Sequence, residues 1–139
     1  MFSQTSIACF GAAHWDCIGQ PDPGFSGKDR PGIVRSRTGG VAANVAVELA
    51  ALGHKIELLS VVGRDRDGTA LLADLKRAGV GTSHLLVSEA FPTGRYIALE
   101  DETGELIGAI ADCQALDALQ ADAFDIEAVA NADYWFVEA

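Results

Sequence analysis

The sequence predicts an α/β fold in which a partial, doubly wound and mostly parallel sheet carries a small antiparallel β lid. Three observations lead to this fold class. The apolar run 7–11 ends in glycine, as a short central strand does. Gly39 and Gly40 precede a run of good helix formers, and an apolar strand pattern follows that run. The segment 95–111 alternates, turns tightly and returns, which predicts a hairpin that a purely parallel sheet would not contain.

The glycine pair opens a turn, helix and strand unit. We expect a helix over 42–52, because alanine, glutamate and leucine favour helix, and Gly53 can adopt the left-handed conformation just past its end. The segment 55–62 is apolar and partly β-branched, which predicts a buried strand ending at Gly63.

The remaining elements are predicted from the positions of prolines and from the spacing of apolar residues. Residues 20–36 contain three of the four prolines, which is typical of loops and edge strands. Leucines at helical spacing predict a helix over 69–78. We also expect a short strand at 84–87, helical segments at 115–119 and 126–130, and a buried strand at 133–138.

The composition limits the kinds of protein that this chain can be. The 139 residues fit one compact domain, and 49% hydrophobic with 22% charged residues is ordinary for a globular chain. The formal net charge of −10 argues against nucleic acid or an anionic membrane as a partner. No stretch reaches the roughly twenty apolar residues of a spanning helix.

The three cysteines, Cys9, Cys17 and Cys113, have neither paired nor metal-ligand spacing. The N-terminus lacks the basic residue and long apolar run of a signal peptide. Together these features predict reduced thiols, a cytoplasmic location and no metal site.

Candidate ligand groups lie at two turns. Gly39 and Gly40 let the backbone approach a ligand closely and point free amides at it, and Asn44 lies about one helical turn further on. Asp16 follows the first buried strand, where open α/β sheets bind ligands. Two plainer alternatives stay open at this point: the glycines only make a sharp turn, and Asp16 only caps one.

The spacing of these residues resembles the N-terminal signature of the PfkB, or ribokinase-like, carbohydrate kinases. A similar Gly-x-Asp-x-x-Gly segment follows at Gly63, Asp65 and Gly68, and the resemblance extends from Ile7 to Glu138. The residues that carry the signature are Gly39, Gly40, Asn44, the small Ala46, Gly53 and Gly63.

This resemblance implies a function. Such a chain would bind the sugar or nucleoside that an ATP-dependent kinase phosphorylates, with lid segments at about 16–38 and 93–111. It implies ATP and Mg²⁺ for the full-length enzyme. A parallel sheet that stops after the strand at 133–138 leaves an exposed edge, so we also expect a homo-oligomer formed through the lid or this sheet edge. The implied substrate-binding residues are Asp16, Gly39, Gly40, Asn44 and Glu138.

Two details concern the substrate. The segments 11–13 and 110–112 look similar to the pseudouridine kinase branch of the family. The lysine usual after the glycine pair in ribokinase-type members is replaced by Val41 and Ala42, which argues against ribose itself.

The family's Gly-Ala-Gly-Asp segment, which supplies an anion hole and the general base, does not occur in the sequence. We therefore expect residues 1–139 to be the N-terminal part of a kinase domain without its ATP-binding and catalytic half. On that expectation the chain alone has no catalytic residue, binds neither ATP nor Mg²⁺, and is inactive. The alternative is a non-catalytic sugar- or nucleoside-binding module. A dinucleotide-binding oxidoreductase is disfavoured, because the glycine spacing after the first strand is wrong.

Overall fold

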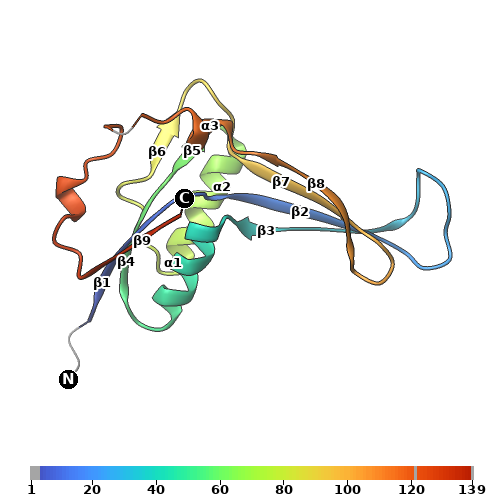
Figure 1. Cartoon of the computed structure of the whole chain (residues 1–139), viewed down its shortest axis with the longest axis horizontal. Helices are drawn as coiled ribbons and strands as arrows, with labels where there is room; N and C mark the ends of the chain where they lie inside the picture. Colours follow the sequence, from blue (N-terminus) through green and yellow to red (C-terminus); the bar gives the residue numbers. More distant parts are fainter. Residues whose placement is uncertain (1–3, 121, 139) are drawn as a thin grey trace.

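A three-stranded parallel sheet forms the centre of the molecule. The computed structural model describes residues 4–120 and 122–138. The strand order is β4 (Lys55–Leu59), β1 (Ser6–Phe10) and β9 (Tyr134–Val137), with β1 in the middle. Figure 1 shows this sheet as the body of the molecule. The expected α/β class is confirmed.

The strand predicted over 55–62 is divided at Ser60. Before it, β4 pairs with β1; after it, β5 (Val61–Gly63) pairs in parallel with β6 (Leu86–Ser88). The carbonyl of Leu59 still accepts a hydrogen bond from Gly11, whereas that of Ser60 accepts one from Leu86. The chain therefore changes partner at this residue, which a local apolar pattern does not record.

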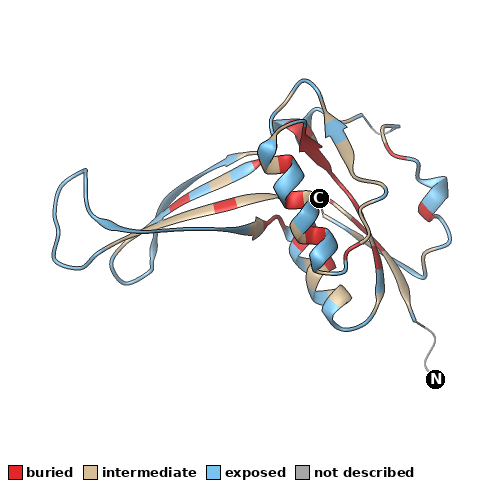
Figure 2. Cartoon of the chain, turned by 180° about the vertical axis from the view of Figure 1, so that it is seen from behind, coloured by how far each residue is buried: buried red, intermediate tan, exposed pale blue. Residues whose placement is uncertain are grey.

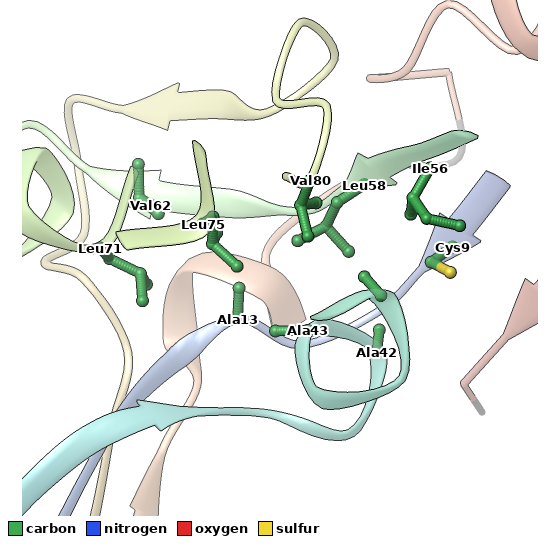
Figure 3. Packing of buried hydrophobic residues seen from close by; sticks show 11 residues of the cluster. Cys9, Ala13, Ala42, Ala43, Ile56, Leu58, Val62, Leu71, Leu75 and Val80 are labelled. Carbon is green, nitrogen blue, oxygen red and sulfur yellow. The ribbon is translucent and has the colours of Figure 1, made fainter. Parts of the chain in front are cut away.

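Two helices cover one face of the sheet. Helix α1 (Val41–Ala51) presents alanines to β1 and β4, and its small side chains let the helix lie close to the strands. Helix α2 (Arg66–Arg77) begins three residues before the predicted helix because Asp65 caps it. Figure 3 shows the shared core, which includes Cys9, Ala42, Ala43, Ile56, Leu58, Leu71, Leu75 and Val80.

The opposite face of the sheet has a thinner cover. Ala8 and Leu59 pack there against Phe124 and Val129. The helix predicted over 126–130 is a single 3-10 turn, η1 (Glu127–Val129), held by i to i+3 hydrogen bonds. The helix expected at 115–119 is the one-turn α3 (Gln114–Asp117).

The strand β9 corrects one expectation. A strand was expected at 133–138 and is present, but its side chains are not buried. Tyr134 is 66% exposed and Val137 is 60% exposed. The reason is position, because β9 is an edge strand of the described sheet.

A second sheet, which we call the lid sheet, extends from the body as a long arm (Figure 1). Its strand order is β3 (Gly32–Gly39), β2 (His14–Pro21), β7 (Arg95–Glu100) and β8 (Leu106–Asp112). The β7–β8 pair is antiparallel, as the hairpin pattern predicts. The β2–β3 pair is also antiparallel, whereas β2 and β7 pair in parallel. Figure 2 shows that most of the arm is exposed or only half-buried.

The lid sheet has two different faces, because side chains alternate along each strand. One face carries Asp16, whose cross-strand partners are Arg37 and Tyr96. The other face carries exposed apolar side chains in neighbouring rows, namely Val34, Ile97, Leu99 and Ile110.

Candidate functional site

Asp16 lies directly against Gly39. The antiparallel register pairs His14 with Gly39, so the start of β2 meets the end of β3. Asp16 is only 8% exposed. A Cβ atom added at Gly39 would lie 2.7 Å from Oδ2 of Asp16 and overlap the rest of the carboxylate. Glycine is therefore required at position 39 for this carboxylate to occupy its place.

Two cationic or polar side chains flank the Asp16 carboxylate. Nδ1 of His14 lies 3.2 Å from Oδ1, and Nε of Arg37 lies 3.4 Å from Oδ2. His14 is largely buried, whereas Arg37 is mostly exposed. Within the described residues, Nδ1 of His14 has no hydrogen-bond partner of good geometry. The carboxylate thus keeps acceptor capacity for the hydroxyl groups of a ligand.

Gly40 forms the turn that begins α1. Its φ of 96° lies in the region that favours glycine, and an added Cβ would be 3.0 Å from the amide nitrogen of Ala13 and overlap the carbonyl of Ala12. That carbonyl accepts a hydrogen bond from the Ala43 amide at 3.2 Å. The close approach of two backbones thus fixes the helix start against the loop after β1.

Asn44 lies on the first turn of α1 and is exposed. Its backbone amide donates a hydrogen bond to the carbonyl of Gly40 at 2.9 Å, as in a regular helix. Among residues 4–120 and 122–138 its side chain makes no hydrogen bond, and no described contact joins it to Asp16. Its predicted role as a ligand group stays a prediction.

Glu138 has a structural role that the sequence did not reveal. Its Oε2 accepts hydrogen bonds from the amides of Ala12 at 2.9 Å and Ala42 at 3.1 Å. Ala42 is in the first turn of α1, so the carboxylate caps the positive end of that helix. The partners lie 126 and 96 residues away in sequence, and no local signal links them. The expected contact of Glu138 with a sugar stays a prediction.

A second polar centre joins the lid sheet to the body. The Asp65 carboxylate accepts hydrogen bonds from the Gly68 amide at 2.7 Å, and from the hydroxyl and amide of Thr93 at 2.6 and 2.8 Å. Thr93 is buried, and its hydroxyl accepts from the amide of Gly63 at 2.9 Å. Sequence reasoning recognised the glycine and aspartate spacing here but not the threonine partner.

These contacts determine how readily Asp65 takes up a proton. Burial raises its pKa, but the hydrogen bonds from Thr93 and Gly68, with the positive charge of Arg95, outweigh burial and hold the pKa below its usual range. Arg95 itself pairs with Asp67, which raises the pKa of the guanidinium. The indole of Trp15 donates to the carbonyl of Asp67 at 3.0 Å, so the root of the lid sheet is fixed to α2.

A mostly apolar cavity of about 770 Å³ opens beside the loop after β1. It lies on the sheet face opposite α1 and α2, next to the exposed strand β9. Its lining includes Phe10, Gly11, Ala12, Cys113, Leu116, Phe124, Trp135, Val137 and Glu138. Within the described ranges, no three His, Cys, Asp or Glu side chains are grouped to hold a metal ion. No helix in the same ranges is both long and apolar enough to cross a membrane.

Comparison with known proteins identifies the class. Residues 4–139 match the pfkB family of carbohydrate kinases. The pseudouridine kinase of Escherichia coli (strain K12) is 35% identical over 117 residues, 84% of this chain. The uncharacterised sugar kinase YeiI of the same organism is 34% identical over 110 residues, 78% of this chain. The chain therefore belongs to the pfkB family, and the resemblance seen in the sequence is confirmed.

The same fold occurs in solved structures. The structure of fructokinase from Xylella fastidiosa with bound ATP superposes on this chain with a TM-score of 0.79. The superposition covers 97% of this chain and 42% of the fructokinase chain. At 24% sequence identity, this similarity is one of fold. The chain spans only part of its relatives, 37% of the pseudouridine kinase and 30% of YeiI.

Proposed function

We propose that this chain is the acceptor-binding part of an ATP-dependent kinase that phosphorylates a hydroxyl of a sugar or nucleoside. The observation that carries the proposal is the Asp16 carboxylate, largely buried against Gly39 and flanked by His14 and Arg37. A buried carboxylate that keeps acceptor capacity is suited to receive hydrogen bonds from adjacent hydroxyl groups. Gly40 and Asn44 would complete the site from the first turn of α1.

Membership of the pfkB family supports the reaction class. The names of the relatives support the substrate class, because they include a pseudouridine kinase and a guanosine-inosine kinase. We expect the lid sheet to close over the acceptor and exclude water from the transfer step.

ATP and Mg²⁺ would be held by residues outside this chain. We assign no residue of this chain to the nucleotide or to Mg²⁺; within the described residues, no three His, Cys, Asp or Glu side chains are grouped. We propose that residues 1–139 are the N-terminal part of the kinase domain and are inactive alone. Binding of an acceptor by the complete gene product without ATP consumption would instead indicate a non-catalytic binding module.

Two further features belong to this proposal. The exposed apolar face of the lid sheet is suited to self-association, and we propose a homo-oligomer formed through it. The acidic net charge argues against nucleic acid and anionic membrane partners, and the three free cysteines agree with a cytoplasmic location.

The test is acceptor binding by the complete product of the gene that encodes this chain. Isothermal titration calorimetry with ribose, fructose, adenosine and pseudouridine identifies what binds. Asp16→Asn should weaken binding by about tenfold or more, because charge-assisted hydrogen bonds contribute about 1.5–3 kcal/mol. Asp22→Asn is the matched control, since Asp22 is an exposed aspartate in the β2–β3 loop. Unchanged affinity in Asp16→Asn would overturn the proposal.

A further inference from the structure

An aromatic pair stands next to Asp16 on the same face of the lid sheet. Tyr96 is the cross-strand partner of Asp16, and His14 precedes Asp16 by two residues on β2. The ring centroids of His14 and Tyr96 are 6.4 Å apart and their planes differ by 31°. This spacing lies within the range of aromatic pairs in proteins, so the two rings form one aromatic surface beside the carboxylate.

The Tyr96 ring is the accessible part of this surface, because the side chain of His14 is largely buried. Tyr96 is only half-buried, and among the described residues its hydroxyl makes no hydrogen bond. The next positions on this face are small, because Tyr96 pairs with Ala111, and Ala98 pairs with Ala109.

His14 lies close to Asp16 and to the backbone of Gly94. Its Nδ1 lies 3.2 Å from Oδ1 of Asp16, and a Cβ atom added at Gly94 would lie 3.1 Å from the Cβ of His14. The ring is therefore held beside the carboxylate while Nδ1 lacks a well-aligned partner among the described residues.

We propose that His14 and Tyr96 form a binding surface for a planar heterocycle, so that the acceptor is a nucleoside rather than a free sugar. The sugar hydroxyls would bind Asp16, and the attached base would stack on the adjoining aromatic surface. This inference rests on the proposed function, because it assumes that Asp16 binds the sugar moiety. It adds the substrate class and two specificity-determining residues.

The experiment measures dissociation constants of the complete gene product for pseudouridine, uridine, inosine and ribose by calorimetry. We expect at least one nucleoside to bind about tenfold more tightly than ribose. Tyr96→Leu should weaken nucleoside binding by about tenfold, since base stacking on an aromatic side chain contributes about 1–3 kcal/mol. Its affinity for ribose should stay within about twofold, and Tyr96→Phe should retain nucleoside binding because the ring is kept.

Matched controls come from the same chain. Tyr134→Leu removes the other tyrosine, which is exposed on β9, and His84→Asn removes a histidine outside the lid sheet; neither should change either affinity. His14→Asn should weaken nucleoside binding more than ribose binding. Thermal unfolding of every variant checks that the fold is kept, and the nucleoside-to-ribose ratio of His14→Asn decides the outcome if Tyr96→Leu does not fold.

The outcomes separate the inference from the proposed function. If Asp16→Asn weakens binding but Tyr96→Leu leaves the nucleoside-to-ribose ratio unchanged, the aromatic surface is overturned and the acceptor site stands. If ribose binds as tightly as every nucleoside, the inference is also overturned. If no ligand binds the wild-type protein, or Asp16→Asn has no effect, the proposed function fails and the inference fails with it.

Discussion

The hydroxyl and the amide of Thr93 both donate to the carboxylate of Asp65, at 2.6 and 2.8 Å. The two residues belong to different parts of the molecule, since Asp65 caps α2 in the body and Thr93 enters β7 of the lid sheet. Because Thr93 is buried and also accepts from Gly63, this contact is a buried polar connection between the lid sheet and the body.

Thr93→Val should destabilise the protein by about 1–3 kcal/mol, because at nearly constant volume it leaves the buried amide of Gly63 without an acceptor and removes one hydrogen bond to Asp65. Urea unfolding followed by tryptophan fluorescence measures the change. Thr103→Val is the control, since Thr103 makes a similar bond to Asp101 in an exposed turn. An equal effect of both substitutions would contradict the assigned importance of the buried contact.

Acid should weaken the same connection. The pKa of Asp65 is lower in the folded state than the usual aspartate value, so the unfolded chain takes up the proton first as the pH falls. The stability that Asp65 contributes is fully present above about pH 4, the unfolded value, and is lost as the pH falls through the lower folded value. In Asp65→Asn, the free energy of unfolding measured with urea should decrease less below about pH 4 than in the wild type. Asp22→Asn should show the same pH dependence as the wild type.

Gly40→Ala should cost about 1–3 kcal/mol more than Gly53→Ala, because both substitutions strain the backbone but only the one at position 40 adds an overlap. Both glycines have positive φ, 96° at Gly40 and 90° at Gly53, but a Cβ at Gly53 meets no atom within 4 Å. The pair therefore separates backbone strain from overlap with the loop after β1. Equal losses in chemical denaturation would mean that this overlap relaxes freely.

Glu138→Ala should reduce stability by about 1–2 kcal/mol, because the amides of Ala12 and Ala42 lose their acceptor. Glu138→Gln keeps an acceptor oxygen and should lose less. Comparing calorimetric acceptor binding of Glu138→Gln with its thermal unfolding separates the two roles of this residue. Weaker binding at unchanged stability would favour the predicted contact with the sugar.

Self-association through the lid sheet is tested on its apolar face. Ile110 is 71% exposed there, next to Ile97 in the neighbouring strand. Ile110→Ser should shift sedimentation equilibrium toward the monomer, because it removes apolar area from the proposed contact. Leu52→Ser, at the end of α1, is a control of similar exposure and should leave the equilibrium unchanged. A monomeric wild-type protein at every concentration would refute the proposed oligomer.

Much of the fold was predictable because the signals were local. The apolar run of β1, the glycine pair before α1 and the alternation of β7 with β8 each span a few residues and reflect intrinsic preferences. The glycine spacing also identified the family, which the comparisons confirm. The parts that differed depend on distant partners, such as the break at Ser60 and the exposure of β9.

The sequence by itself determined the fold class and the family, and it predicted Asp16 and Gly39 as site residues, because residue preferences and glycine spacing are local properties of the chain. Only the tertiary structure decided that Glu138 caps α1, that Thr93 binds Asp65, and that Tyr96 stands beside Asp16. The hydrogen bonds of Glu138 to Ala42 and of Thr93 to Asp65 join residues that lie 96 and 28 positions apart in the sequence. Their partners depend on how the strands pair, and pairing follows from the packing of the whole chain rather than from any short stretch.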